Sequence, residues 1–173
     1  MRKLNSMICA SVLAVTAGAG FAQERVNAFD DWSVYTASSP KECWIVSAPL
    51  SVENTRGGRK VSVNRGDILM QVTWVPDQKI VGEVSFTGGY TFVQEQAVKL
   101  QIGASGFEMI PDGGNAWPAA PDIDTQVRIA MTKGSRAIVT GVSARSGTQT
   151  KDTFSLKGFT AALNDAKKRC GLT

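Results

Sequence analysis

The sequence predicts an all-β fold, an antiparallel β-sandwich with two short helices. Three observations support this class. Eight or so short segments alternate apolar and polar residues, which is the pattern of strands with one buried face. Glycine-rich turns separate these segments at regular intervals, as in sandwiches and barrels. Helical spacing occurs in only two short stretches, which disfavours a doubly wound α/β fold. A closed β-barrel is the alternative topology.

The first residues predict export. Arg2 and Lys3 precede a short apolar run, and small residues at positions 20 and 22 suit a signal peptidase. We therefore expect residues 1–22 to be a secretory signal peptide and residues 23–173 to form a single domain. The apolar run is shorter than the ~20 residues that a transmembrane helix needs, and no other stretch approaches that length.

The charge of the expected mature chain is small. The whole sequence carries 19 Lys and Arg against 15 Asp and Glu, a formal net charge of +4, and loss of Arg2 and Lys3 leaves 17 against 15. The remaining basic residues are scattered along the chain. A nucleic-acid-binding protein usually concentrates them on one face, so nucleic acid is not an expected partner.

The predicted strands occupy most of the chain after residue 29. Gly57-Gly58 supplies a turn, and the Arg65-Gly66-Asp67 break is predicted to be the turn of a hairpin. Gly88-Gly89 is expected to end a strand in a bulge or bend. Residues 111–121 contain three prolines and two adjacent glycines and are predicted to be a loop. The predicted strands are 30–37, 41–50, 60–63, 68–75, 82–90, 98–102, 107–110, 136–144 and 151–158.

Helical spacing predicts two short helices. The first covers residues 122–133, with Asp122 as its N-cap and Gly134 at the C′ position that follows its end. The second begins after Gly158 and runs to residue 170. Its apolar residues recur at i, i+4, i+7 and i+11 and form one stripe: Phe159, Leu163, Ala166 and Cys170.

The cysteines predict one disulfide. Loss of Cys9 with the leader leaves Cys43 and Cys170, and an even count in an exported chain indicates a bond. This bond would tie the C-terminal helix to an early strand. The chain-entropy model gives about 4–5 kcal/mol of stabilisation for so long a loop. Two unrelated buried thiols are the alternative, which an oxidising compartment disfavours.

Missing residue types limit the chemistry. The sequence contains no histidine, which excludes Ser-His-Asp and Cys-His catalysis and the usual imidazole metal sites. With both mature cysteines in a disulfide, a thiol nucleophile is not expected either. No metal-ligand spacing, phosphate loop or dinucleotide fingerprint is present. We therefore expect a protein that is not an enzyme and has no cofactor and no metal.

One loop is the candidate binding site. Residues 143–152, SARSGTQTKD, are dense in short hydrogen-bonding side chains that could recognise a partner. An ordinary polar hairpin loop is the alternative interpretation. The candidate binding residues are Arg145, Ser146, Thr148, Gln149, Lys151 and Asp152.

Several segments resemble the invasion-associated locus B family of exported alphaproteobacterial proteins. These segments cover most of the expected domain, and the last is the most specific: DWSVY, SPKECWIVSAP, NRGDILMQVTW, GEVSFTGGY, MTKGSRAIVTG and SGTQTKDTFSLKGFTAALNDAKKRC. The resemblance implies an immunoglobulin-like β-sandwich without established enzymatic activity. It also implies a location in the periplasm or at the cell surface.

These observations favour an exported, non-enzymatic binding protein of the cell envelope. Its expected partner is another envelope protein or a host-surface protein. The alternative is a stress or assembly factor that holds other exported proteins through an exposed strand edge. A hydrolase that uses paired carboxylates is the third hypothesis, and it is less favoured because sequence alone pairs no two acids.

Overall fold

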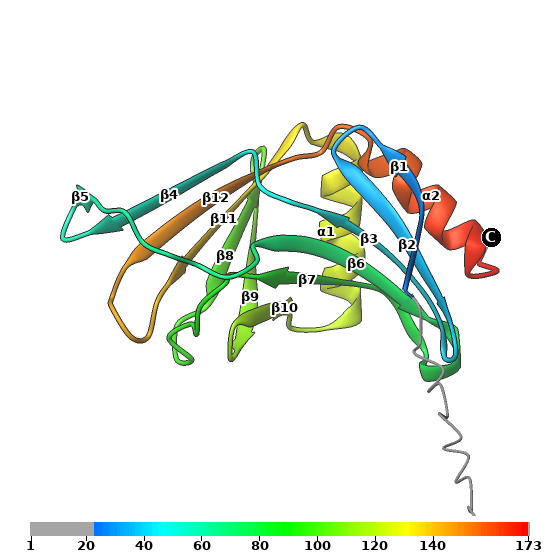
Figure 1. The fold of residues 1–173 in the computed structure, drawn as a ribbon, viewed down its shortest axis with the longest axis horizontal. Helices are drawn as coiled ribbons and strands as arrows, with labels where there is room; N and C mark the ends of the chain where they lie inside the picture. The colour runs from blue at the N-terminus through cyan, green and yellow to red at the C-terminus, as the bar shows by residue number, and fades with distance from the viewer. Residues whose placement is uncertain (1–22, 173) are drawn as a thin grey trace, which may run out of the picture.

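Twelve antiparallel strands form one sheet in the computed structural model, which describes residues 23–172 (Figure 1). The predicted signal peptide and Cys9 lie outside the described residues. The strand order is β1-β2-β3-β6-β7-β10-β9-β8-β11-β12-β4-β5. The strands are β1 (Glu24–Phe29), β2 (Trp32–Ser38), β3 (Lys41–Ser47), β4 (Ser51–Arg56), β5 (Arg59–Lys60), β6 (Leu69–Val75), β7 (Ile80–Thr87), β8 (Val98–Ile102), β9 (Ser105–Asp112), β10 (Asn115–Pro118), β11 (Arg136–Val142) and β12 (Gln149–Ser155).

Helices interrupt the strands at three places. Helix α1 (Pro121–Lys133) lies between β10 and β11, α2 (Phe159–Arg169) follows β12, and the 3₁₀ turn η1 (Pro76–Gln78) joins β6 to β7. Both predicted helices are thus confirmed, to within a residue or so at each end. Within residues 23–172, none of these helices has the length and apolar character needed to cross a membrane.

The sheet folds over so that its two halves face each other across one core (Figure 1). Trp32 on β2 donates a hydrogen bond from its indole Nε1 to the carbonyl oxygen of Ser155 on β12, at 3.0 Å, although these strands are far apart in the sheet order. Phe86 on β7 meets Phe154 on β12 edge to face, with ring centroids 6.0 Å apart. Because β1 and β5 end the strand order, the sheet is open and not a closed barrel. The predicted all-β, immunoglobulin-like sandwich is confirmed.

The core is formed by every second residue of the facing strands. On β2, Trp32 and Val34 have no exposed surface, and the residues beside them are at least partly exposed. Full burial of one large apolar side chain contributes about 1.5–3 kcal/mol, so the alternating pattern accounts for most of the driving force for folding. The largest buried side chains are Trp32, Trp74, Phe86, Phe92, Phe154 and Phe159.

Helix α2 covers the inner side of β1, β2 and β3. Phe159, at its start, packs edge to face against Trp32 with ring centroids 4.9 Å apart. The predicted apolar stripe is present, with Ala162 fully buried and Leu163 half-buried beside it. Gly158 precedes the helix with a φ of +85°, and a Cβ there would lie 2.0 Å from the carbonyl oxygen of Phe29, so only glycine fits. The predicted disulfide between Cys43 and Cys170 is also confirmed, and it fixes the end of α2 to β3.

Helix α1 takes the place of a neighbouring strand along part of β7. Strand β10 pairs only with the end of β7, which leaves backbone groups of the preceding residues without a strand partner. Asp124 accepts a hydrogen bond from the backbone N–H of Val84 at 2.7 Å, and Arg128 donates to the carbonyl oxygen of Gly82. Side chains of α1 therefore satisfy polar groups that would otherwise be left unpaired at the edge of the sheet.

Both predicted ends of α1 need correction. The helix begins at Pro121 with Ala120 as its N-cap, so Asp122 is not the cap, because proline is suited to the first helical position. Gly134 is the C-cap, with an extended φ of −85° and not the left-handed conformation. A Cβ at Gly134 would lie 2.6 Å from Cγ2 of Ile102, so glycine is needed for close packing on β8.

Three strands were not predicted. Strand β1 contains a register shift between Arg25 and Asn27, and such a bulge destroys the period-two pattern. Strand β4 has polar residues on both faces. Residues 115–118 form β10 inside the segment predicted to be a loop, because Ala116 is fully buried opposite Phe86 and Pro118 lies at the strand end, where proline is tolerated.

The predicted hairpin around Arg65-Gly66-Asp67 is wrong. Residues 61–68 are not a strand but a coil that runs from β5 to β6, and the hairpin that does form joins β4 to β5 through the predicted Gly57-Gly58 turn. Arg65 is the physical reason, because its side chain is buried and bound to other segments of the chain.

The disulfide should contribute strongly to stability, since it closes a separation of 127 residues. We expect Cys43→Ser to lower the free energy of unfolding by about 2–5 kcal/mol. Urea denaturation with and without reductant would measure the change. The double variant Cys43→Ser/Cys170→Ser is the control, since it should be insensitive to reductant. An identical stability of oxidised and reduced wild-type protein would contradict this prediction.

Candidate functional site

Strand β12 contributes to two polar sites, because successive side chains of a strand point to opposite faces. Thr150 and Asp152 are buried and face the interior. Gln149 and Lys151 are exposed on the outer face. The binding loop predicted from the sequence is therefore divided between the two sides of the sheet.

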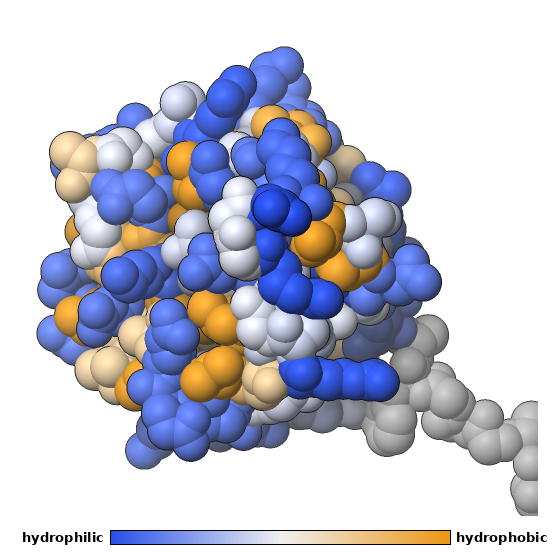
Figure 2. Space-filling model, turned by 90° about the vertical axis from the view of Figure 1, so that its left-hand side faces the viewer, coloured by the Kyte–Doolittle hydropathy of each residue, from blue (hydrophilic) through white to orange (hydrophobic). Residues whose placement is uncertain are grey.

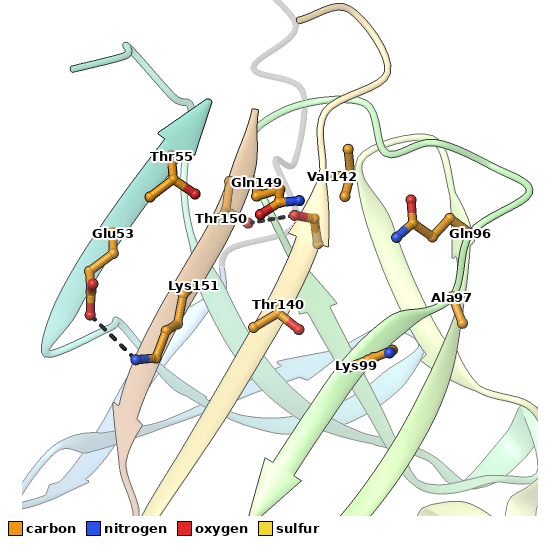
Figure 3. A pocket seen from close by; sticks show the side chains of 11 residues that line it. Glu53, Thr55, Gln96, Ala97, Lys99, Thr140, Val142, Gln149, Thr150 and Lys151 are labelled. Atoms are coloured by element: carbon orange, nitrogen blue, oxygen red, sulfur yellow. Dashed lines mark hydrogen bonds and ion pairs between the residues drawn. The ribbon is translucent and has the colours of Figure 1, made fainter. Parts of the chain in front are cut away.

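The outer site is a groove of about 340 Å³ on the outer face of β4, β12, β11 and β8, which we call the outer groove (Figure 3). Its lining residues lie in two rows that cross the strands, as the strand register requires. The first row is Glu53, Lys151, Thr140 and Lys99. The second row is Thr55, Gln149 and Val142, continued by Gln96 and Ala97 from the segment before β8.

The charged side chains of the outer groove are Glu53, Lys99 and Lys151, and Glu108 borders it. The ammonium Nζ of Lys151 lies 3.6 Å from Oε1 of Glu53, and both side chains are about half exposed, at 50% and 43%. An exposed pair of this kind is weak and can exchange partners, because water screens it. Lys99 is exposed and forms no ion pair with any residue in the range 23–172. The strand register places exposed Glu108 on β9 directly opposite Lys99, so the first row continues to a second carboxylate and the two ammonium groups lie between two acids.

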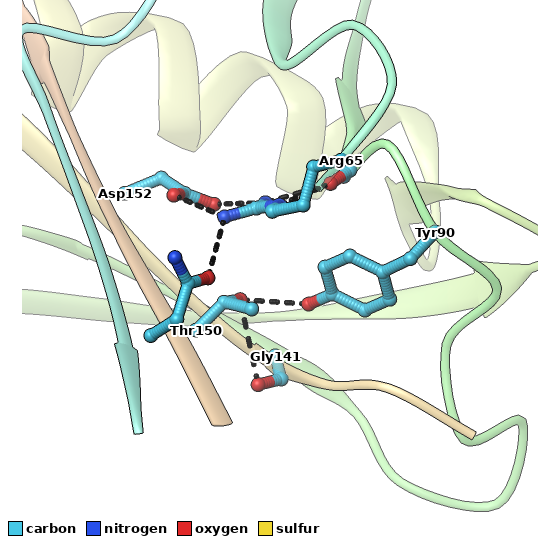
Figure 4. Close-up of polar contacts among 7 residues, drawn as sticks. Arg65, Tyr90, Gly141, Thr150 and Asp152 are labelled. Atoms are coloured by element: carbon cyan, nitrogen blue, oxygen red, sulfur yellow. Dashed lines mark hydrogen bonds and ion pairs between the residues drawn. The ribbon is translucent and has the colours of Figure 1, made fainter. Parts of the chain in front are cut away.

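The inner site centres on Arg65, which comes from the coil between β5 and β6. Its partners are Asn54, Gly88, Tyr90 and Asp152, and we call these five residues the Arg65 network (Figure 4). Nε and Nη2 donate to the carbonyl oxygen of Gly88 at 2.9 and 2.7 Å. Nη1 and Nη2 donate to Oδ1 and Oδ2 of Asp152 at 2.7 and 2.6 Å, and Nη1 also reaches Oδ1 of Asn54 at 3.4 Å. All five N–H groups of the guanidinium thus have partners, which leaves none for a ligand.

Tyr90 extends the Arg65 network to β11. The guanidinium carbon of Arg65 lies 5.0 Å from the centre of the Tyr90 ring, a cation–π distance. The Tyr90 hydroxyl lies 2.7 Å from Oγ1 of Thr150, which in turn lies 3.5 Å from the carbonyl oxygen of Gly141. That carbonyl can only accept, so Thr150 donates to it and Tyr90 donates to Thr150. Burial raises the pKa of Tyr90 to about 12, although the Arg65 charge acts in the opposite direction.

The Arg65 network is structural and not catalytic. Asp152 has no exposed surface, and burial raises the pKa of its carboxyl above the ordinary value, while the hydrogen bonds and charge of Arg65 lower it. The adjoining hollow measures about 60 Å³, which leaves room for a few water molecules but not for a substrate. The network instead holds residues 61–68 against β4 and β12.

The remaining predicted loop residues lie around the turn that joins β11 to β12. Arg56 on β4 donates from Nε and Nη2 to Oγ1 of Thr148, at 3.2 and 2.8 Å. Ser146 donates to the same Thr148 oxygen at 2.9 Å, whereas Arg145 is exposed. Of the six predicted residues, only the two exposed ones on β12 line the outer groove, and Asp152 belongs to the Arg65 network. A binding role for these residues stays a prediction.

Arg65, Glu53 and Lys99 were not predicted to be site residues, because no local motif marks them. Cross-strand register brings Glu53 opposite Lys151 and places Lys99 and Lys151 on either side of Thr140. That register depends on β4, whose polar sequence gives no strand pattern. Within residues 23–172, no cluster of three or more Cys, Asp and Glu side chains could hold a metal ion.

Fold and site together define a class: an antiparallel β-sandwich with a disulfide-tied C-terminal helix and a polar groove on its outer face. A solved protein with this fold is invasion associated protein B from Bartonella henselae. The structures match with a TM-score of 0.55 over 85% of this chain and 96% of the other, at 19% sequence identity. The resemblance noted in the sequence is thus confirmed at the level of the fold. No family model matches the chain, and no curated protein matches it either.

Removal of Arg65 should destabilise the protein strongly. Arg65→Met leaves Asp152 buried without its cation, and we expect a loss of about 3–5 kcal/mol in the free energy of unfolding. Lys151→Met is the matched control, because it breaks an exposed pair and should cost at most about 1 kcal/mol. Urea denaturation measures both. Equal losses in the two variants would show that the buried pair contributes no more to the free energy of unfolding than the exposed pair does.

Alkaline titration should detect the buried hydroxyl of Tyr90. Its pKa is raised from 10.0 to about 12 in the folded protein, so the folded state holds this proton more tightly than the unfolded state. The resulting stability is fully present below pH 10 and is lost as the pH rises through about 12. Tyrosinate absorbance of the wild type, compared with Tyr90→Phe, isolates this transition, and Tyr35→Phe should retain it. A Tyr90 transition at pH 10 would contradict the prediction.

Proposed function

We propose that this protein is an exported, non-enzymatic binding protein of the cell envelope, and that a partner protein docks in the outer groove. The observation that carries the proposal is the groove itself. It offers two exposed ammonium groups, a carboxylate, amides and hydroxyls on four paired strands, which hold these side chains at fixed spacing. A rigid platform of this kind favours binding, because little conformational entropy is lost when the partner docks.

The distribution of acids argues against a carboxylate-dependent hydrolase. Such an enzyme needs two carboxyl groups on either side of a substrate. Among the described residues that line the outer groove, Glu53 alone carries a carboxylate, and it is paired with Lys151. Asp152 is fully buried and bound to Arg65. The absence of histidine from the sequence removes the other common source of a general base.

Two features support a location in the periplasm or at the cell surface. The N-terminal sequence has the pattern of a secretory signal peptide. The disulfide between Cys43 and Cys170 is buried, with 1% and 4% exposure, and bonds of this kind form in oxidising compartments. Both features support export, and the fold shared with invasion associated protein B is consistent with it.

A holding role for unfolded proteins is the second candidate. Strand β5 pairs with only two residues of β4, so part of the β4 edge faces no strand among the described residues. Leu50 and Val52 beside this edge are 57% and 41% exposed. The edge is short, however, and short edges are poor templates for pairing. Figure 2 shows this end of the molecule, where apolar surface forms separate spots between hydrophilic side chains and not one broad patch.

Photocrosslinking in the native bacterium tests the proposal. A benzophenone amino acid in place of Gln149 reports on the outer groove, one in place of Val52 reports on the β4 edge, and one in place of exposed Lys133 on α1 is the control. We expect the probe at Gln149 to capture one or two specific envelope proteins, because the groove presents the docking groups. Capture of many unrelated exported proteins at Val52 alone would favour the holding role. Capture at Gln149 no greater than at Lys133 would overturn the proposal.

A further inference from the structure

We infer that one end of the molecule docks on a membrane surface rich in anionic phospholipids, through four exposed cations on two neighbouring turns. We call these cations the basic tip: Arg56, Arg59, Lys60 and Arg145. The inference goes beyond the proposed function, because the basic tip lies beside the outer groove and none of its four residues lines that groove. Three features lead to it: the position of the two turns, their charge, and their projecting shape.

The strand register brings the two turns of the basic tip together. The first turn joins β4 to β5, and pairing places Arg56 opposite Arg59 and Lys60 opposite Thr55. The second turn joins β11 to β12, and β12 pairs with β4. Arg56 donates from Nε and Nη2 to Oγ1 of Thr148, at 3.2 and 2.8 Å, so the first turn is tied to the second. Figure 1 shows that the β4–β5 hairpin projects from one end of the molecule.

The two turns contain cations and no acids. All four cations of the basic tip are exposed, and none forms an ion pair with a residue in the range 23–172. The sequence has no Asp or Glu between positions 54 and 66 or between positions 141 and 150. The fold therefore gathers at one end basic residues that lie far apart in the sequence.

Acids on adjoining segments do not cancel this charge. Glu53 on β4 is paired with Lys151, and Asp152 on β12 is buried and paired with Arg65. Two exposed acids, on the coil before β6 and in the turn before β8, form no ion pair with the basic tip within the described part of the chain: Asp67 and Glu95. Four cations against these two acids still leave an excess of two positive charges.

The shape of the basic tip fits a flat anionic surface better than a small anion. Neither the outer groove nor the smaller hollow beside Arg65 is lined by any of the four cations. Figure 2 views the molecule from this end, and strongly hydrophilic side chains occupy the middle of the face. A bilayer of anionic lipids attracts such cations without a pocket, and each Lys or Arg near the surface strengthens binding about fivefold.

Co-sedimentation with lipid vesicles tests this inference on the full protein purified after export. One set of vesicles contains phosphatidylcholine alone, and the other contains phosphatidylcholine mixed with phosphatidylglycerol, which carries a negative charge. We expect the protein to sediment with the second set and not with the first. Binding should be lost as salt is raised to about 1 M, where the screening length falls to about 3 Å.

A pair of double variants locates the docking surface. Arg59→Gln/Lys60→Gln removes two cations of the basic tip and should weaken binding to the phosphatidylglycerol vesicles about tenfold to thirtyfold. Lys133→Gln/Lys168→Gln removes the same net charge from α1 and α2, and it should change binding by less than about twofold if the site is the tip. All four side chains are exposed, so both variants should fold normally, and thermal denaturation checks this.

Four outcomes would overturn the inference. Equal binding to both sets of vesicles would show that lipid charge does not matter, and equal losses in the two double variants would show that only net charge matters. Release from the vesicles by inorganic phosphate would replace the membrane surface by a single phosphate group. Binding to heparin without binding to vesicles would replace it by a soluble polyanion. None of these outcomes involves the groove, so crosslinking at Gln149 decides the proposed function separately.

Discussion

The alternation of side chains along β12 is the constraint on which both polar sites depend. Because successive residues of a strand face opposite sides, Asp152 is placed beside Arg65 in the interior while Lys151 is placed beside Glu53 on the surface. Neither site could be shifted without shifting the other. A displacement of β12 by one residue would move the buried carboxylate into water and the exposed ammonium into the core.

The Arg65 network anchors a coil that is not part of the sheet. The coil of residues 61–68 belongs to no strand and crosses one end of the structure between β5 and β6. Its backbone N–H groups donate to other segments at Val61, to Asn54, and at Gly66, to Gly89. A guanidinium with five satisfied donors ties this coil to β12 through Asp152, to β4 through Asn54, and to the turn after β7 through Gly88. Two of the strands beneath the outer groove, β4 and β12, are thus held from the inner side by hydrogen bonds to one side chain.

Local patterns in the sequence predicted part of the fold. Periodicity and cysteine count predicted the all-β class, the helix that begins at Phe159 and the disulfide, because these signals are visible along the chain. Strand β4 and the role of Arg65 were not predicted, because they depend on partners far away in sequence, 87 residues in the case of Arg65 and Asp152. The position of the candidate loop was predicted correctly. Which of its side chains face the interior and which face the outer groove could be assigned only from the strand register. Lys99 could be assigned to the groove only after that register was known.

The disulfide between Cys43 and Cys170 turns most of the domain into a covalent ring. The exposed turn at residues 144–147, between β11 and β12, lies within this ring. A protease that cuts the backbone there once would open the ring but would not release a fragment. The nicked protein would keep its mass apart from one added water, and its two pieces would separate only after reduction. While the disulfide stays oxidised, a single cut in this surface turn would therefore not divide the molecule.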